Sequence, residues 1–128
     1  MDKSKRKMDK AKWLEDCWVT WVRVGFGVKQ YMAFHPDFIS PVGVVWIIEA
    51  CGRKRKEASV IYSFVLPFFR RYGIRSLINA KLLDVYDLVT TPDGTAEGKA
   101  FMRANGYTFD KARGDWYRKR ETNRRAGA

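Results

Sequence analysis

The stretch "VLPFFRRYGIRSLI", residues 65–78, decides how the fold is interpreted. An apolar, strand-like run ends at Pro67, two arginines follow, and an amphipathic helix begins after Gly73. The first N–H groups of a helix and the positive end of its dipole converge on one point, which favours anions. Gly73 carries no Cβ and lets a ligand approach the backbone, and Arg70 and Arg71 supply charge suited to phosphate. The stretch predicts an anion site, with a merely solvated basic helix start as the alternative.

Length and composition bound the class of protein. The chain has 128 residues, 46% hydrophobic and 30% charged, which is the balance of one globular domain rather than of a disordered chain. Its longest apolar run, "VGVVWII", is too short to span a bilayer. Cys17 and Cys51 show no metal-ligand spacing, so we expect no metal site and reduced thiols in a cytoplasmic compartment.

The positive charge is concentrated at the two ends of the chain. Of the net charge of +11, residues 1–12 carry +4 and residues 111–128 carry +5. Basic ends of this kind favour a polyanion such as nucleic acid in a sequence-independent way, and solubilising termini are the equally good alternative. We expect a disordered basic arm at 1–7, a single domain at 8–119 and a flexible basic tail at 120–128.

Hydrophobic periodicity predicts a helix followed by a meander. Residues 8–23 show helical spacing of their apolar side chains, which predicts an amphipathic helix packed through its tryptophans. Residues 28–35, 42–50 and 58–66 read as three consecutive strands that form an antiparallel meander. The polar connection "CGRKRKE" suits the hairpin between the last two.

The second half of the chain predicts a crossover and a closing hairpin. A helix is expected over 72–83, and the strand "YDLVTT" after it suggests a parallel βαβ crossover. Thr95 is the expected N-cap of a helix over 96–104, which ends at the "ANG" preceding Tyr107. "YTFDK" and "DWYRKR" form the final hairpin, so the fold class is α/β with a mixed sheet.

The order of these elements resembles the GNAT superfamily, the Gcn5-related N-acetyltransferases. The family's pyrophosphate loop reads [Q/R]-x-x-G-x-[G/A] after a strand ending in Val-x-Pro, and Val65, Pro67, Arg70 and Gly73 match it. The downstream "DLVTT…TAEGKAFMRANGYTF…GDWYRK" is similar to the family's fifth strand, following helix and last hairpin. The resemblance covers about residues 42–119.

The resemblance implies a cofactor site and a reaction. Acetyl-CoA would serve as acyl donor, lying in a cleft between two splayed strands, and an unknown amine would be the acceptor. The residues implied in holding the cofactor are Val65, Arg70, Arg71, Tyr72, Gly73, Ile74, Arg75 and Ser76. The sequence differs from the family pattern in three places: Arg75 replaces a Gly or Ala, Met102 replaces a tyrosine, and Thr95 replaces an Asn.

Candidates for the catalytic base are few. Glu57 or a water is the candidate base, since alternation along the strand places Glu57 on the same face as Ser59, Ile61 and Ser63. The family's glutamate would fall two residues later, nearer Ser59. A solvated charge at the end of a hairpin is the alternative for Glu57, and Glu49 is the weaker candidate. The single histidine, His35, is expected to be structural or solvated. Tyr62, Tyr107 and Tyr117 could each supply a phenol, and spacing does not choose among them.

Two functions remain open from the sequence. The first is an acyl-CoA N-acyltransferase. The second is a catalytically degenerate GNAT-like structural or interaction protein, such as a phage virion component, because small diverged chains of this kind occur in phage genomes. It would dock protein partners through the tryptophan-rich first helix and nucleic acid through the basic ends. The location would then be the host cytoplasm or the virion, with no membrane association.

Overall fold

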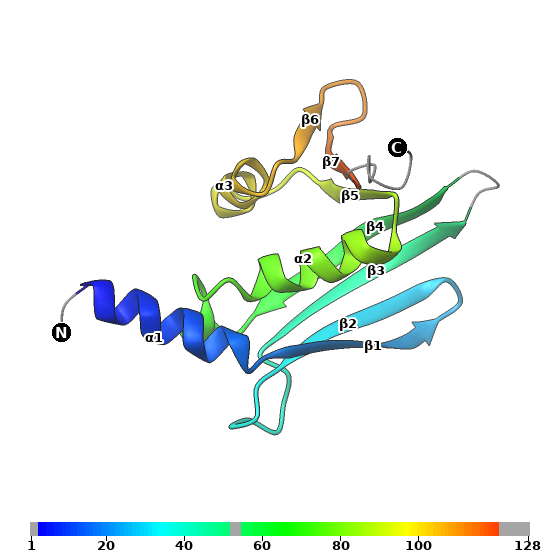
Figure 1. Cartoon of the computed structure of the whole chain (residues 1–128). Helices are drawn as coiled ribbons and strands as arrows, with labels where there is room; N and C mark the ends of the chain where they lie inside the picture. Colours follow the sequence, from blue (N-terminus) through cyan, green and yellow to red (C-terminus); the bar gives the residue numbers. More distant parts are fainter. Residues whose placement is uncertain (1–2, 52–54, 121–128) are drawn as a thin grey trace, which may run out of the picture.

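A computed structural model describes residues 3–51 and 55–120 of the chain. Its centre is a seven-stranded sheet in the order β1-β2-β3-β4-β5-β7-β6 (Figure 1). Every neighbouring pair is antiparallel except β4 and β5, which run parallel. The predicted mixed α/β sheet is therefore confirmed.

The N-terminal prediction is wrong in its second half. Helix α1 spans Lys3–Glu15, so it begins inside the segment expected to be a disordered arm and ends eight residues early. Strand β1, Trp18–Gly25, follows it and pairs with β2. Trp18 and Trp21 consequently lie on an edge strand, while Trp13 on α1 packs against the core. The tryptophan-rich docking helix proposed from the sequence does not exist in that form.

The predicted meander is confirmed. It consists of β2, Val28–Phe34, β3, Gly43–Cys51, and β4, Lys56–Val65. Its pairing is regular except at one point, where Trp46 faces Tyr62 while the next residue, Ile47, faces Val60. Ile61 is therefore an extra residue in β4, a β-bulge that bends the strand and reverses its side-chain alternation.

The crossover is also confirmed. A short 3₁₀ turn η1, Pro67–Phe69, leads from β4 to helix α2, Ile74–Val85, and the chain returns as β5, Leu88–Pro92. Helix α2 buries Ile74, Ile78 and Leu82 against the sheet. Each of these three side chains is at most 1% exposed, so they form the face of the helix that packs on the sheet.

The C-terminal elements have the predicted order. Helix α3 spans Ala96–Ala104, the expected bounds, with Thr95 as its N-cap. Strands β6, Thr108–Asp110, and β7, Asp115–Lys119, form the closing hairpin, and β7 also pairs with β5.

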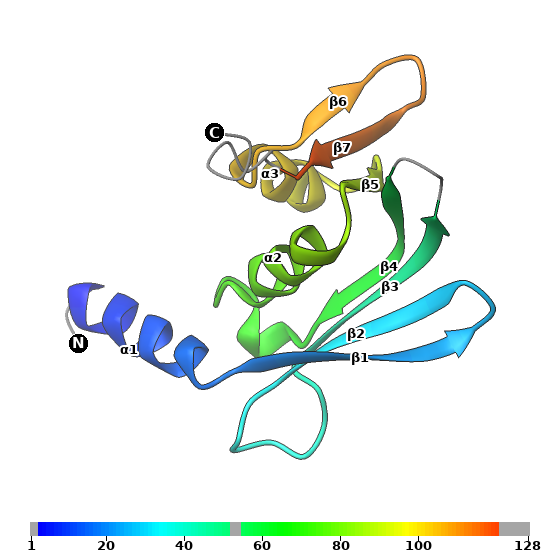
Figure 2. The same cartoon turned by 45° about the vertical axis from the view of Figure 1, so that its right-hand side comes forward.

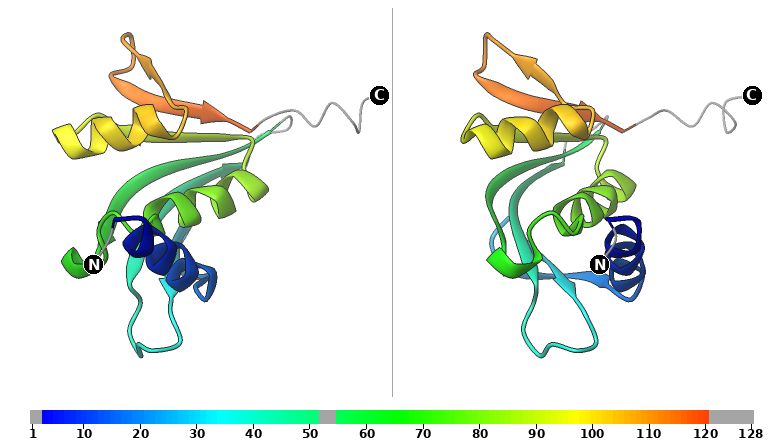
Figure 3. Two further views of the ribbon diagram at one scale, coloured as in Figure 1. Left: turned by 60° about the vertical axis from the view of Figure 1, so that its left-hand side comes forward. Right: turned by 90° about the vertical axis from the view of Figure 1, so that its left-hand side faces the viewer.

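The arrangement in space separates two parts of the sheet. Strands β1–β4 form one curved surface, and β5–β7 diverge from it as a smaller unit that carries α3 (Figure 2). Helices α1 and α2 lie on the same side of the larger surface (Figure 3). None of the helices among the described residues is long and apolar enough to cross a bilayer.

Candidate active site

The central feature of the site is the divergence of β4 and β5. The two parallel strands pair only at Glu57–Leu88, Ala58–Val89 and Ser59–Thr90. Beyond Ser59 the bulge bends β4 away, and β5 soon reaches Pro92, which has no N–H to donate. The backbone of β4 from residue 60 to residue 65 therefore has no partner strand on its β5 side, and the two strands form a slot.

Two cavities occupy this region. The larger has a volume of about 810 Å³ and lies between the end of β4, the start of α2 and one face of α3. The smaller, about 230 Å³, lies between the bulged part of β4, the end of β5 and the same helix. They adjoin, because both are lined by Ser63, Thr95, Gly98 and Met102.

The start of α2 gives the larger cavity its anion-binding character. Gly73 caps the helix with φ at +88°, a left-handed conformation that glycine adopts without strain, and no side chain caps the first N–H groups. Arg71, two residues earlier, is the only described residue other than glycine with a positive φ, at +70°. A left-handed arginine costs about 1–2 kcal/mol. Strained backbone of this kind clusters at active sites and ligand-binding segments.

The structure brings together almost all of the residues implied in cofactor binding. Tyr72 is the exception, because its ring packs edge-on against Trp13 and Phe69 and does not line the cavity. The residues that do line it are Val65, Arg70, Arg71, Gly73, Ile74, Arg75 and Ser76.

The three arginines of the turn differ in their surroundings. Arg70 is exposed, and its Nε donates to the carbonyl oxygen of Val65 at 3.3 Å. Arg71 is also exposed. Arg75 instead lies over the ring of Phe101 on α3, 4.9 Å from its centroid, so the arginine does not close the cavity but forms part of its wall.

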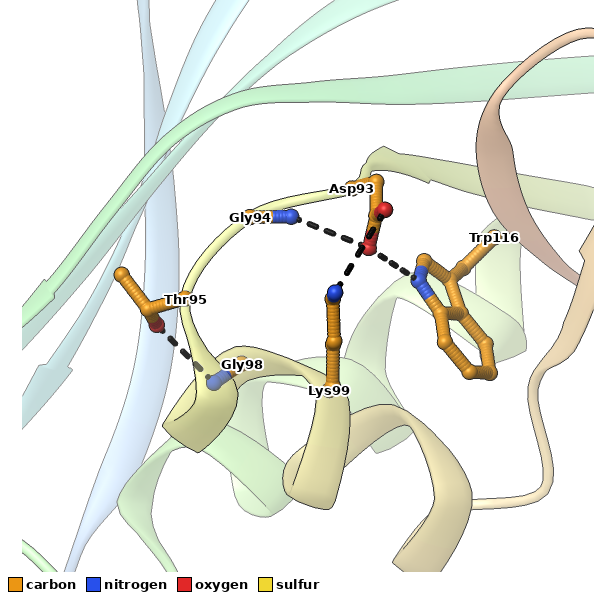
Figure 4. Close-up of polar contacts among 6 residues, drawn as sticks. All are labelled: Asp93, Gly94, Thr95, Gly98, Lys99 and Trp116. Atoms are coloured by element: carbon orange, nitrogen blue, oxygen red, sulfur yellow. Dashed lines mark hydrogen bonds and ion pairs between the residues drawn. The ribbon is translucent and has the colours of Figure 1, made fainter.

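The opposite wall is held in place by Asp93, which follows β5. Its Oδ1 accepts hydrogen bonds from Trp116 Nε1 at 3.0 Å and from the backbone N–H of Gly94 at 3.2 Å (Figure 4). Lys99 Nζ lies 3.9 Å from the other oxygen. These contacts lower the pKa of Asp93, the Trp116 hydrogen bond most of all. Asp93 therefore ties the loop before α3 to β7 and remains a carboxylate.

Thr95 fixes the first turn of α3 in the same loop. Its Oγ1 accepts the N–H of Gly98 at 3.1 Å (Figure 4). Thr95, Gly98 and Phe101 all line the larger cavity, so the cap controls the shape of that wall. The N-cap pattern predicted the helix, but sequence reasoning did not assign these residues to the cofactor site.

The structure does not bring Glu57 to the cleft. Glu57 stands six residues before Ser63, about 20 Å along the strand. It does not line either cavity, and its Oε1 is 2.6 Å from Arg55 Nε. The bulge at Ile61 also breaks the alternation that placed Glu57 and Ser63 on one face. The expectation that Glu57 and Ser63 share a face is therefore wrong, whereas Glu57 and Ser59, both before the bulge, do share one.

Glu49 and His35 have structural surroundings. Glu49 accepts a hydrogen bond from Tyr86 Oη at 2.6 Å and lies 2.9 Å from Lys29 Nζ. His35 is 3% exposed and stacks on Trp13. Neither residue lines the two cavities, in keeping with the structural role expected for His35.

Among the three candidate phenols, the structure favours Tyr62. Tyr62 lines the smaller cavity and is half exposed. Tyr107 is buried and donates to Asn79 Oδ1, and burial raises its pKa. Tyr117 lies on β7 and lines neither cavity of the cleft. Met102 lines both cavities, so no phenol occupies that position.

The similarity of this chain to known proteins is structural. No sequence family and no curated protein with which the sequence was compared gives a match. A GNAT-family acetyltransferase from Staphylococcus aureus Mu50 superposes with a TM-score of 0.61 at 12% identity, over 94% of this chain and 81% of the other. The Escherichia coli ribosomal-protein-S18-alanine N-acetyltransferase gives 0.55 at 10% identity, over 95% and 92%.

A third similar structure was solved with a ligand. Arabidopsis thaliana Naa50, in complex with the bisubstrate analogue CoA-Ac-MVNAL, superposes with a TM-score of 0.54 at 16% identity, over 69% of this chain and 68% of the other. All three similarities lie at the level of the fold. The chain therefore has the GNAT fold.

Proposed function

We propose that this protein is an acyl-CoA N-acyltransferase that binds acetyl-CoA, or a related thioester, in the cleft between β4 and β5. The observation that carries the proposal is the slot itself, which ends at the uncapped start of α2. A parallel sheet gains nothing from leaving six residues of a strand edge unpaired, whereas an extended ligand can use that edge. Arabidopsis Naa50 of similar fold binds a CoA-containing analogue.

The binding part of the proposal assigns two surfaces to two parts of the ligand. The N–H groups that follow Gly73 would hold the diphosphate, since they are uncapped and the helix dipole favours anions there. Arg70 and Arg71 at the rim add two positive charges. The free edge of β4 near Ser63 and Val65 would accept the amide groups of the pantetheine arm.

The chemical part requires an amine nitrogen, a thioester carbonyl and two proton transfers. The nitrogen attacks the carbonyl carbon, the C–S bond breaks, the amine loses a proton and the departing sulfur gains one. Asp93 is the only carboxylate among the described residues lining the two cavities, and its lowered pKa makes it a weak base. We assign the removal of the amine proton to water, and most of the acceleration to positioning.

The Tyr62 phenol is the group that we assign to the departing sulfur. Among the phenols considered it is the one that lines the cleft, and a neutral phenol can donate a proton to a thiolate. Replacing Tyr62 with Phe is expected to lower kcat about tenfold or more while leaving KM for the thioester nearly unchanged. Thermal unfolding of the same variant is the control. A lower Tm would mean that the loss of activity comes from damage to the fold and not from the missing phenol.

Calorimetric titration with acetyl-CoA tests the binding site. Wild-type protein is expected to bind with a Kd in the micromolar range. Gly73→Ala would weaken binding because alanine resists φ of +88°, and Gly114→Ala is the matched control. Gly114 has φ of +71° in the hairpin before β7 and lies outside the cleft. Gly114→Ala should therefore lower the free energy of unfolding by about 1–2 kcal/mol without changing the binding site. Absence of binding to the wild type at millimolar acetyl-CoA rejects the proposal.

A non-catalytic GNAT-fold binding protein is the second candidate. It is favoured by Met102 at the position where the resemblance implied a tyrosine, and by the distance of Glu57 from the cleft. Its signature is acetyl-CoA binding without release of free thiol in the presence of peptides or polyamines bearing free amines. Retention on heparin that falls steeply with salt would add the polyanion role expected from the basic ends.

A further inference from the structure

The side of the β1–β4 sheet that faces away from α1 and α2 carries large apolar side chains that remain exposed to solvent. Residues that pair across neighbouring strands lie on the same side of a sheet. Val22 on β1 faces Gln30 on β2. Gln30 faces Trp46 on β3, which in turn faces Tyr62 on β4. Residues two positions away along each strand extend this surface, which we call the outer face. Its exposed apolar members are Trp18, Val22, Trp46, Ile48, Tyr62 and Phe64.

The helices lie on the other side of the same strands. Tyr31, Val45 and Ile47 alternate with residues of the outer face, are at most 2% exposed, and belong to the core that α2 completes. Figure 3 shows α1 and α2 together on that inner side of the sheet. The outer face is therefore a second apolar surface, and none of its exposed members belongs to the core of the single chain.

The exposed apolar area of the outer face is large for a single chain. Its six exposed side chains keep between 37% and 51% of their surface in contact with solvent. Because a large side chain presents roughly 150–250 Å² when free, they leave about 500 Å² exposed. The partly exposed Val28, Phe34 and Val44 add to this. The largest apolar patch of a monomer is about 300–600 Å², whereas each partner in a stable complex buries about 800 Å². The outer face approaches the size of an interface.

The aromatic side chains of the outer face are already held in place by their neighbours. The indole N–H of Trp46 donates to Gln30 Oε1 at 2.7 Å, and its ring meets that of Tyr62 edge-on, with 6.2 Å between centroids. Trp18 stacks on Phe34 with 5.6 Å between centroids. Covering Trp46 would therefore leave its N–H satisfied and would cost little side-chain entropy. Preorganised aromatic side chains of this kind are the usual anchors of protein interfaces.

Charge limits what can cover the outer face. The chain has a net charge of +11, yet the only charged residue on the outer side of the described parts of β1–β4 is Glu57, at the hairpin end of β4. A polyanion would find no cation there to bind. An uncharged sheet surface fits, because two sheets pack face to face through their apolar sides. A second copy of the chain offers such a surface and places no cation of one outer face against a cation of the other.

We propose that the protein forms a symmetric dimer in which the outer faces of two copies pack on each other. The contact is isologous, so the same patch is buried on both copies. Trp46 and Ile48 on β3 lie near the middle of the contact, whereas Tyr62 and Phe64 lie at its edge, where the outer face meets the cleft. The dimer does not depend on the proposed function, since it would form whether or not the cleft binds a thioester.

Sedimentation of the full-length chain over about 1–100 μM tests the dimer. The wild type is expected to have twice the mass of one chain at both about 0.15 M and about 1 M salt, because salt does not screen an apolar contact. Its tryptophan emission is expected to shift to shorter wavelength as the concentration rises, since Trp18 and Trp46 lose their exposure to water.

Glutamate substitutions on the outer face identify the surface that is used. Ile48→Glu and Val22→Glu should weaken the dimer at least about tenfold, because each would bury a carboxylate without a partner. Val85→Glu is the matched control, since Val85 is also exposed, at 38%, but ends α2 on the other side of the sheet. All three changes lower the net positive charge, so none of them adds repulsion between two copies.

Thr20→Glu keeps the test decisive if the first two variants fail to fold. Thr20 is already an exposed polar residue of β1, and its pairing with Met32 places it on the outer face. Circular dichroism shows which variants are folded. Loss of the dimer in the folded outer-face variants, with Val85→Glu still dimeric, supports the proposal.

Three results would overturn the dimer. A wild type that remains a monomer at the highest concentration leaves the outer face to a different apolar partner. A dimer that persists in every folded outer-face variant must use another surface. A dimer that dissociates at about 1 M salt is held by charge and not by this face. None of these results bears on acetyl-CoA binding, which calorimetry tests separately.

Discussion

The indole of Trp13 lies parallel to the imidazole of His35, with 4.2 Å between ring centroids and 6° between planes. Phe69 of the η1 turn stacks on the same indole at 4.8 Å. Trp13 thereby joins α1, the end of β2 and the turn that leads into the cleft. One side chain connects the N-terminal helix to the candidate site.

Replacing Trp13 with Ala is expected to destabilise the protein by about 2–3 kcal/mol, because a large half-buried ring leaves a gap between two others. Urea unfolding measures the change. Phe26→Ala is the control, since Phe26 is fully exposed in the β1–β2 turn and its removal should have little effect. An equal loss in both variants would show that the stack contributes nothing of its own.

Glu49 predicts a dependence of stability on pH. Its pKa lies below the ordinary 4.5, chiefly because Tyr86 donates a hydrogen bond to it and secondly because Lys29 does. A carboxyl group whose pKa is lowered by folding stabilises the fold above the unfolded value. That contribution is lost as the pH falls through the folded pKa.

Glu49→Gln should therefore reduce the free energy of unfolding at pH 7 by about 1–3 kcal/mol, with the difference from wild type shrinking as the pH falls below 4.5. Urea denaturation of both proteins in buffers at about pH 7, 5, 4 and 3 measures the difference in their free energies of unfolding. Glu15→Gln, at the exposed end of α1, is the control. Curves for wild type and Glu49→Gln that stay parallel across the range would contradict the assignment.

Gly43 of β3 faces the start of α2 at close range. A Cβ added to Gly43 would lie 2.7 Å from Ile74 Cγ2, which is too close for two carbon atoms. Gly43→Ala is expected to cost about 1–3 kcal/mol through overpacking and to weaken acetyl-CoA binding by displacing the first residue of α2.

Gly25→Ala is the matched control for that change. A Cβ on Gly25 would lie at an ordinary 3.7 Å from the Val28 side chain, its φ is not positive, and Gly25 lines neither cavity. Thermal unfolding and calorimetry of both variants separate the overpacking from the loss of backbone freedom. Normal affinity in a destabilised Gly43→Ala protein would mean that the position of Ile74 does not control the site.

Thr95→Ala removes the cap of α3. Loss of the hydrogen bond to Gly98 is expected to cost about 1 kcal/mol and to weaken acetyl-CoA binding, because the capped turn forms one wall of the cleft. Thr95→Ser keeps the hydroxyl and should behave as the wild type. A defect of equal size in Thr95→Ser would point to the lost methyl group rather than to the cap.

The fold was predictable where local signals are strong. The bounds of α3 agree with prediction because Thr95 at one end and the Asn-Gly pair at the other act within a single helix. The β1 segment misled because Trp18, Trp21 and Val22 fit a helical stripe as well as a strand with apolar side chains on both faces. Pairing with β2, a tertiary interaction, decides between the two.

The candidate site was predictable in part for the same reason. The turn around Gly73 is local, and the residues named there line the larger cavity, with the exception of Tyr72. The assignment of Glu57 relied on uninterrupted alternation along the strand. Isoleucine is an ordinary strand residue, so the sequence did not predict the bulge at Ile61. Arg75 contacts Phe101, a residue distant in sequence that only the folding of the chain brings near, so a local sequence pattern could not predict the contact.

The bulge at Ile61 has an evolutionary consequence. The bulge reverses which residues of β4 face which side of the sheet. Deletion of one residue there would therefore turn Ser63 and Val65 toward the other side. Substitutions can alter this strand gradually, but a deletion cannot. Homologues of this chain should therefore differ in residue type along β4 more readily than in the number of residues.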